Sequence, residues 1–153
     1  MACCKRLNTL GLSGKPGESM ITDDIAERLS ETFSKDLGAL LKKVDISNNL
    51  ALSAAKFGEV LRSLTSRAQS LEYINLSGSN THVMLTNEKA DELISLLEED
   101  PDALHNIKEI DLSRNVALSA RTLGELLGLI FRTCPLLSTL RLKGYDSFSM
   151  IEN

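Results

Sequence analysis

The stretch DISNNLALSA, residues Asp45–Ala54, returns almost unchanged as DLSRNVALSA, residues Asp111–Ala120. The offset from position 45 to position 111 is 66 residues, and it continues past this phrase, since Gly58–Glu59 corresponds to Gly124–Glu125. Self-similarity at a fixed period is typical of repeat proteins, in which each unit buries its apolar face against its neighbours. The sequence therefore predicts one domain over residues 1–153, built by stacking similar units.

Each 66-residue period divides into two shorter units, and every unit opens with three apolar residues at the same spacing. The last two of the three alternate with polar residues, which is the periodicity of a strand. Successive triplets begin 34, 30, 36 and 30 residues apart, so long and short units alternate. The triplets are Leu7, Leu10, Leu12; Leu41, Val44, Ile46; Leu71, Ile74, Leu76; Ile107, Ile110, Leu112; and Leu137, Leu140, Leu142. We expect strands near 7–13, 41–47, 71–77, 107–113 and 137–143.

The segments between the strands have helical periodicity, and each has the same start signal. Thr22, Ser53, Thr86 and Ser119 are suited to accept hydrogen bonds from free backbone N–H groups as N-caps. An apolar residue stands just before each cap and another four residues after it, which is the spacing of a hydrophobic staple. Four helices are therefore expected to begin after these residues. Gly58 and Gly124 occupy equivalent places in two of them, and we interpret both as points of close helix approach or register.

Strands that alternate with helices and pair in parallel form right-handed crossovers. Repeated along the chain, this arrangement gives an α/β solenoid. Its five parallel strands would line a concave face, and its helices would cover the convex face.

The five strand segments resemble leucine-rich repeats, whose general form is Leu-x-x-Leu-x-Leu-x-x-Asn. Asn49 and Asn115 stand three residues after the last apolar residue of their units, as in that form. Units of about 30 residues with a full helix, and Thr133-Cys134-Pro135 before a strand, are similar to the ribonuclease-inhibitor-like subclass. The resemblance extends from Leu7 to Lys143. The sequence departs from the form at Lys15, Ser79 and Tyr145, where Asn is expected; Asn80 is a candidate for the third turn, one place late.

Composition restricts the class of partner and the compartment. A net charge of −4 argues against nucleic acid or an anionic membrane, because those ligands need a concentrated basic face. The sequence has neither a transmembrane-length apolar run nor a secretory signal. Cys3, Cys4 and Cys134 have no disulfide spacing, which predicts a reducing, cytoplasmic location. Ala2 excludes an N-myristoylation motif, so Cys3 and Cys4 are interpreted as ordinary terminal cysteines rather than acylation sites.

A search of the sequence for catalytic groups does not assemble a site. The glycine-rich segment 11–19 fails the spacing of a phosphate-binding loop, and Pro16 follows Lys15 where Ser or Thr is required. His82 and His105 lie in different units without other metal ligands at suitable spacing. No histidine is placed to activate the serines that recur after the strands. We therefore expect neither an enzyme nor a cofactor.

The predicted recognition surface is the strand face turned away from the core. Alternation places three residues of each strand segment there, and the third of them is Ser13, Ser47, Ser77, Ser113 or Lys143. We predict that Asp45, Asn75, Glu109 and Asp111 form an acidic middle, with Tyr73 as its one large aromatic residue and Arg141 and Lys143 as a basic end. The candidate partner-binding residues are Lys43, Asp45, Tyr73, Asn75, Glu109, Asp111, Arg141 and Lys143. The alternative is a set of solvated residues, with Asp45, Asn75 and Asp111 partly serving loop hydrogen bonds.

A second candidate surface consists of the longer loops of units one and three, residues 14–21 and 78–85. Met20, Val83 and Met84 either offer an apolar contact there or pack the loops against each other. The first alternative would place a partner at the sheet edge, whereas the second is purely structural.

The fold class therefore predicts a non-catalytic protein–protein interaction module. One alternative is a regulator of an enzyme, of the inhibitor or GTPase-activating type, since the leucine-rich repeat family includes both. Another is a structural segment of a longer solenoid, or a chain that associates end to end. Residues 145–153 are expected to fold over the last unit through Phe148, Met150 and Ile151, unless that end is left for such an association.

Overall fold

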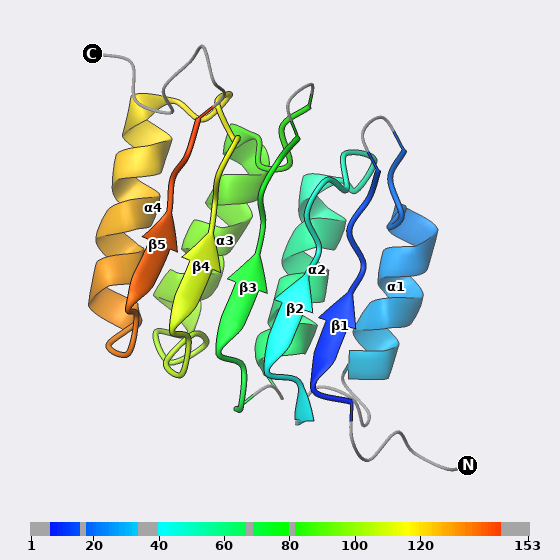
Figure 1. Ribbon diagram of the computed structural model, residues 1–153, viewed down its shortest axis with the longest axis horizontal. Coiled ribbons are helices and arrows are strands. Elements are labelled where there is room, and N and C mark those ends of the chain that lie inside the picture. The colour runs from blue at the N-terminus through cyan, green and yellow to red at the C-terminus, as the bar shows by residue number, and fades with distance from the viewer. Residues whose placement is uncertain (1–6, 16–17, 34–39, 67–68, 80–81, 145–153) are drawn as a thin grey trace.

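The computed structural model describes residues 7–15, 18–33, 40–66, 69–79 and 82–144. Strands and helices alternate along this part of the chain (Figure 1). The strands are β1 (Thr9–Gly11), β2 (Lys43–Asp45), β3 (Tyr73–Asn75), β4 (Glu109–Asp111) and β5 (Thr139–Arg141). The helices are α1 (Asp23–Thr32), α2 (Ala54–Thr65), α3 (Asn87–Glu99) and α4 (Ala120–Thr133). Each strand lies within one of the five predicted segments, at its centre.

The strands form one parallel sheet in chain order, β1-β2-β3-β4-β5, and the four helices cover one of its faces (Figure 1). Backbone hydrogen bonds continue beyond the short strands, for example from Leu112 N to Arg141 O at 2.9 Å and from Arg114 N to Lys143 O at 2.7 Å. The strand segments are therefore paired over more residues than the strands themselves contain. The α/β class and the parallel order predicted from the repeat are confirmed. We call the sheet face opposite the helices the open face.

The core lies between the sheet and the helices and is almost wholly aliphatic. The apolar triplets of the three middle units are at most 2% exposed, as the repeat predicts. The triplets of the first and last units, Leu7–Leu12 and Leu137–Leu142, are only partly buried. This difference follows from the stacking, because an end unit has a neighbour on one side only.

All four helices begin where the sequence predicts, and three of the caps are closed by side chains. Ser53, Thr86 and Ser119 each accept a hydrogen bond from the N–H group three residues on. Thr22 occupies the same place before α1 but makes no side-chain cap bond, so that part of the prediction is wrong. The staple residues around the caps are buried in the core in every unit.

The caps give a first testable difference. Ser119→Ala removes a cap bond to Thr122 N of 3.1 Å and should lower the free energy of unfolding by about 1 kcal/mol. Thr22→Ala removes no such bond and should cost less than half of that. Urea denaturation of both variants measures the free energy of unfolding. Equal losses of stability would show that the side-chain cap bond does not contribute to the stability of the helix.

The two repeated asparagines join units in pairs. Asn49 is fully buried, and its Nδ2 donates to Leu12 O at 2.8 Å, in the preceding unit. Its Oδ1 accepts from Met20 N at 2.9 Å and Ile21 N at 2.7 Å, in the same preceding unit. Asn115 makes the equivalent bonds to Leu76, Met84 and Leu85. Each short unit therefore fixes the long loop of the unit before it.

Two glycines in the long loops make this close approach feasible. A Cβ atom on Gly78 would lie 2.7 Å from both Arg114 O and His82 O, which are backbone atoms. A Cβ on Gly14 would similarly overlap Asn48 O. The third turn uses a hydrogen bond from Ser79 N to His82 O at 2.7 Å, while Asn80 and Tyr145 lie outside the described residues.

The equivalent helix glycines turn out to differ. A Cβ on Gly58 would overlap the Glu92 carboxylate of α3 and the Arg62 guanidinium, so the ends of two long side chains lie over this glycine. A Cβ on Gly124 would meet nothing within 4 Å. The prediction of close helix approach is therefore wrong for Gly124, which borders a hollow between α3 and α4, whereas Gly58 is covered by side chains.

Candidate functional site

The open face carries the predicted recognition residues in two rows that run across the strands. Pairing register places Lys43, Tyr73, Glu109 and Thr139 side by side in one row. It places Asp45, Asn75, Asp111 and Arg141 in the next row. Lys143 follows β5 by two residues. Because adjacent parallel strands lie about 4.8 Å apart, the side chains of one row are near enough to contact one ligand together.

The middle of the second row also serves the backbone. Oδ1 of Asp45 accepts from Ser47 N at 3.0 Å, Oδ1 of Asn75 from Ser77 N at 3.0 Å, and Oδ1 of Asp111 from Ser113 N at 2.9 Å. The alternative that these residues serve loop hydrogen bonds is therefore confirmed for one side-chain oxygen of each. The same turns bury Ser47 and Ser113, so the expectation that these serines lie exposed on the sheet is wrong.

Tyr73 lies half-buried between Lys43 and Glu109 in the first row. Burial raises the pKa of its hydroxyl, and the negative charges of Asp111, Asp45 and Glu109 raise this pKa further. The phenol therefore stays protonated and can donate a hydrogen bond. A half-buried aromatic ring with a polar tip suits the centre of an interface, because little side-chain entropy is lost when it binds.

The predicted basic end is not separate from the acidic middle. Arg141 Nε lies 2.7 Å from Glu109 Oε1, diagonally across β4 and β5. This hydrogen bond, with the charge of Glu109, raises the pKa of Arg141 above its already high ordinary value. The pair holds the Arg141 side chain over the sheet, so its remaining guanidinium N–H groups have a defined place.

A hollow of about 400 Å³ lies beside this ion pair, where β4 and β5 end. It is lined by Ser77, Asp111, Ser113, Arg114, Arg141, Leu142 and Lys143. The sequence prediction contained Asp111, Arg141 and Lys143 but missed Arg114. One signal was available in the sequence. The repeated phrase has Asn48 in its first copy and Arg114 at the equivalent position of its second copy.

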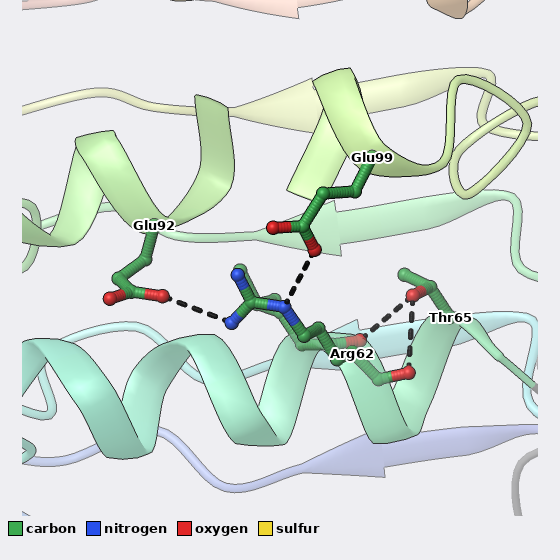
Figure 2. A network of polar contacts seen from close by, with 5 residues as sticks. Arg62, Thr65, Glu92 and Glu99 are labelled. Carbon is green, nitrogen blue, oxygen red and sulfur yellow. Dashed lines mark hydrogen bonds and ion pairs between the residues drawn. The ribbon is translucent and has the colours of Figure 1, made fainter. Parts of the chain in front are cut away.

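The helix side carries a polar cluster of a different kind, shown in Figure 2. Arg62 of α2 reaches across to α3, with Nη1 3.0 Å from Glu92 Oε2 and Nε 3.5 Å from Glu99 Oε2. The hydrogen bond that Arg62 donates to the Glu92 carboxylate raises the pKa of Arg62. The Thr65 hydroxyl donates a hydrogen bond within its own helix, to Leu61 O at 3.0 Å. Every group in the cluster is paired within the helix layer, so it holds α2 against α3.

Lys89 makes a second polar contact between the same two units. Its side chain is buried, and Nζ donates to Asn49 O at 3.3 Å and to Met84 O at 3.2 Å. Burial lowers the pKa of Lys89, and the charge of Asp23 opposes that shift. Both acceptors are backbone carbonyl groups of loops, so the ammonium fastens two loops together.

The remaining candidates for chemistry stay apart in the described structure. His105 Nδ1 faces Asp102 at 3.9 Å on an exposed turn, and burial raises the pKa of the Cys134 thiol, which disfavours its reactive thiolate. Among the residues described, no group of three potential metal ligands converges. In the same residues, no helix combines the length and apolar character that a bilayer crossing requires.

The proposed loop surface is also changed by the structure. Met84 is fully buried and belongs to the core, whereas Met20 is 52% exposed. The three residues therefore do not form one exposed apolar patch, and the alternative of structural packing is confirmed for Met84. Cys3, Cys4 and residues 145–153 lie outside the described residues.

Comparison with protein-family models finds no match, and searches of curated proteins and of solved structures also find none.

Proposed function

We propose that this chain is a non-catalytic protein–protein interaction module of the leucine-rich repeat type, and that it binds a protein partner through the open face. The observation that carries the proposal is the registered pair of rows across β2 to β5, which gathers residues from four units onto one surface. We also propose that the protein is cytoplasmic and that it binds its partner without a cofactor.

The composition of the two rows favours a protein ligand over a small molecule. Tyr73 provides an aromatic anchor, and Glu109 and Arg141 provide a fixed ion pair beside it. Interfaces commonly concentrate binding energy in such Tyr and Arg residues, surrounded by polar contacts that exclude water. An extended segment or a rigid loop of a partner would fit along the rows, with basic groups near Asp45 and Asp111.

The test uses site-specific photo-crosslinking, because it reports the contact surface directly. A photoreactive phenylalanine analogue replaces Lys43 on the open face in one variant and Glu98 on α3 in another. We expect a discrete heterologous crosslink from position 43 and none from position 98. A crosslink only between copies of this chain would overturn the proposal in favour of end-to-end association, and crosslinking only from the helix side would move the site to the convex layer.

The captured partner then allows an affinity test. Tyr73→Ala should weaken binding by roughly thirtyfold or more, the loss expected of an interface hot spot of about 2 kcal/mol. Glu109→Lys should weaken it as well, because it breaks the pair with Arg141 and reverses a charge. Glu98→Lys is the matched control with the same charge change on an exposed helix position. Equal affinity of all three variants would exclude the open face.

A further inference from the structure

The hollow at the ends of β4 and β5 has a chemical character that the rest of the open face lacks. Three cations, Arg114, Arg141 and Lys143, line it together with one carboxylate, Asp111. The same region one pair of units earlier, after β2 and β3, carries Ser47, Asn48 and Asn75 and no cation. A chain of net charge −4 therefore concentrates positive charge at one point of its sheet face.

Several donors in the hollow keep unused hydrogen-bonding capacity. Nε of Arg141 donates a hydrogen bond to Glu109 Oε1 at 2.7 Å. The two terminal nitrogens of Arg141 make no hydrogen bond within the described residues. The Lys143 ammonium forms no ion pair with any residue that the structure describes. Ser113 Oγ accepts from Lys143 N at 3.2 Å, which leaves its O–H free to donate.

The carboxylate in the hollow is already occupied in part. Asp111 Oδ1 accepts from Ser113 N at 2.9 Å, and Glu109 is taken by Arg141. Neither acid neutralises Lys143 directly by an ion pair in the described residues. Among the residues that line it, the hollow therefore has three cationic side chains and one carboxylate.

Arg114 has a backbone conformation that disfavours its residue type. Its φ is 63°, in the left-handed region, where Asn is several-fold enriched and long side chains are uncommon. Asn48 holds the equivalent position in the other pair of units, with a φ of 59°. The backbone thus has the same shape in both copies, and only the copy beside Arg141 and Lys143 carries Arg. Such local strain is characteristic of positions selected for binding.

We propose that this hollow binds a phosphoryl group on a side chain of the protein partner. Two guanidinium groups, an ammonium and serine hydroxyls offer more donors than the two oxygens of a carboxylate can use. A phosphorylated serine or threonine presents three acceptor oxygens and close to two negative charges, and bidentate arginine contacts suit it. The inference deepens the proposed function and rests on it for the ligand being part of a protein.

The test titrates the labelled full chain with a short blocked peptide, acetyl-Gly-phosphoserine-Gly-amide, and follows backbone amide NMR signals. We expect saturable shifts confined to residues 111–114 and 141–144, with a dissociation constant on the order of 1 mM for so small a probe. The same peptide with serine should cause none, and the peptide with glutamate should bind at least tenfold more weakly. Inorganic phosphate serves as the second probe and should shift the same signals.

The matched variant is Arg114→Asn, which introduces the residue that the equivalent turn already uses. It should fold at least as stably as the original chain and should bind the phosphopeptide at least tenfold more weakly. Asn48→Arg, the reverse exchange in the other copy, should not create binding, because Asn75 and Ser77 stand there at the positions equivalent to Arg141 and Lys143. Unchanged affinity in Arg114→Asn, or equal binding of phosphoserine and glutamate peptides, would overturn the proposal.

The two proposals fail in different ways. If the phosphopeptide causes no localised shifts while Tyr73→Ala still abolishes partner binding, the phosphoryl site is wrong and the open-face interface stands. If the phosphopeptide binds as described but position 43 yields no crosslink to another protein, the hollow is a phosphoryl site and the wider interface is wrong.

Discussion

Asn115→Ala should lower the free energy of unfolding by about 3–5 kcal/mol. Asn115 is fully buried. Its Nδ2 donates to Leu76 O at 2.9 Å and Leu112 O at 3.0 Å, and its Oδ1 accepts from Met84 N at 2.9 Å and Leu85 N at 2.8 Å. Alanine would leave these four backbone groups buried without their partner, and each buried unsatisfied group costs roughly 1–3 kcal/mol before relaxation.

Urea denaturation of the purified chain measures this loss, provided that the slope with denaturant stays constant. Asn106→Ala is the control, because Asn106 makes one exposed side-chain hydrogen bond, to Gln69 O at 2.7 Å. We expect the control to cost about 1 kcal/mol or less. If Asn115→Ala costs no more than Asn106→Ala, the asparagine bonds do not hold the units together.

Gly78→Ala should destabilise the chain by about 2–3 kcal/mol, because overpacking against rigid atoms forces the backbone to move. The new Cβ would lie 2.7 Å from the carbonyl oxygens of Arg114 and His82. Neither oxygen belongs to a flexible side chain that could turn away. The shift would also disturb the hydrogen bond from Gly78 N to Ser113 O, which is 3.0 Å long.

Gly124→Ala provides the opposite result from the same chemical change. A Cβ there meets nothing within 4 Å, and the residue lies inside α4. Alanine is favoured over glycine in a helix interior by about 1 kcal/mol, so this variant should be more stable than the original chain. Thermal unfolding of both variants gives the comparison. Two changes of the same sign would show that steric room does not decide the outcome.

The repeated pattern was sufficient to predict the sheet and the helix starts. Ile74 and Ile110 illustrate why, since each stands in a triplet with the spacing of the others and each is 1% exposed. A pattern that recurs in five units is supported by every copy, and local strand and helix signals agree with it. The order of the strands follows from the same repetition, because neighbouring units in sequence become neighbours in the sheet.

Features that depend on one copy alone were harder to predict. Gly58 and Gly124 are equivalent in sequence, yet only Gly58 is covered, by a carboxylate from the next helix. Met84 was predicted to lie in a loop, but its side chain is buried in the core. Asn115 accepts a hydrogen bond from the Met84 backbone N–H group and so fixes the backbone at this residue. On the open face, the places of the eight candidate residues were predicted from alternation. The contacts between them, such as the Glu109–Arg141 pair, depend on side-chain reach across strands and are not encoded in the period.

The asparagine bonds join the first unit to the second and the third to the fourth, whereas Arg62 and Lys89 join the second to the third. Ion pairs with partly exposed partners weaken as ionic strength rises, while buried amide bonds respond little. A rise in ionic strength is therefore expected to weaken the Arg62 contacts between the second and third units, while the asparagine bonds on either side of them stay intact.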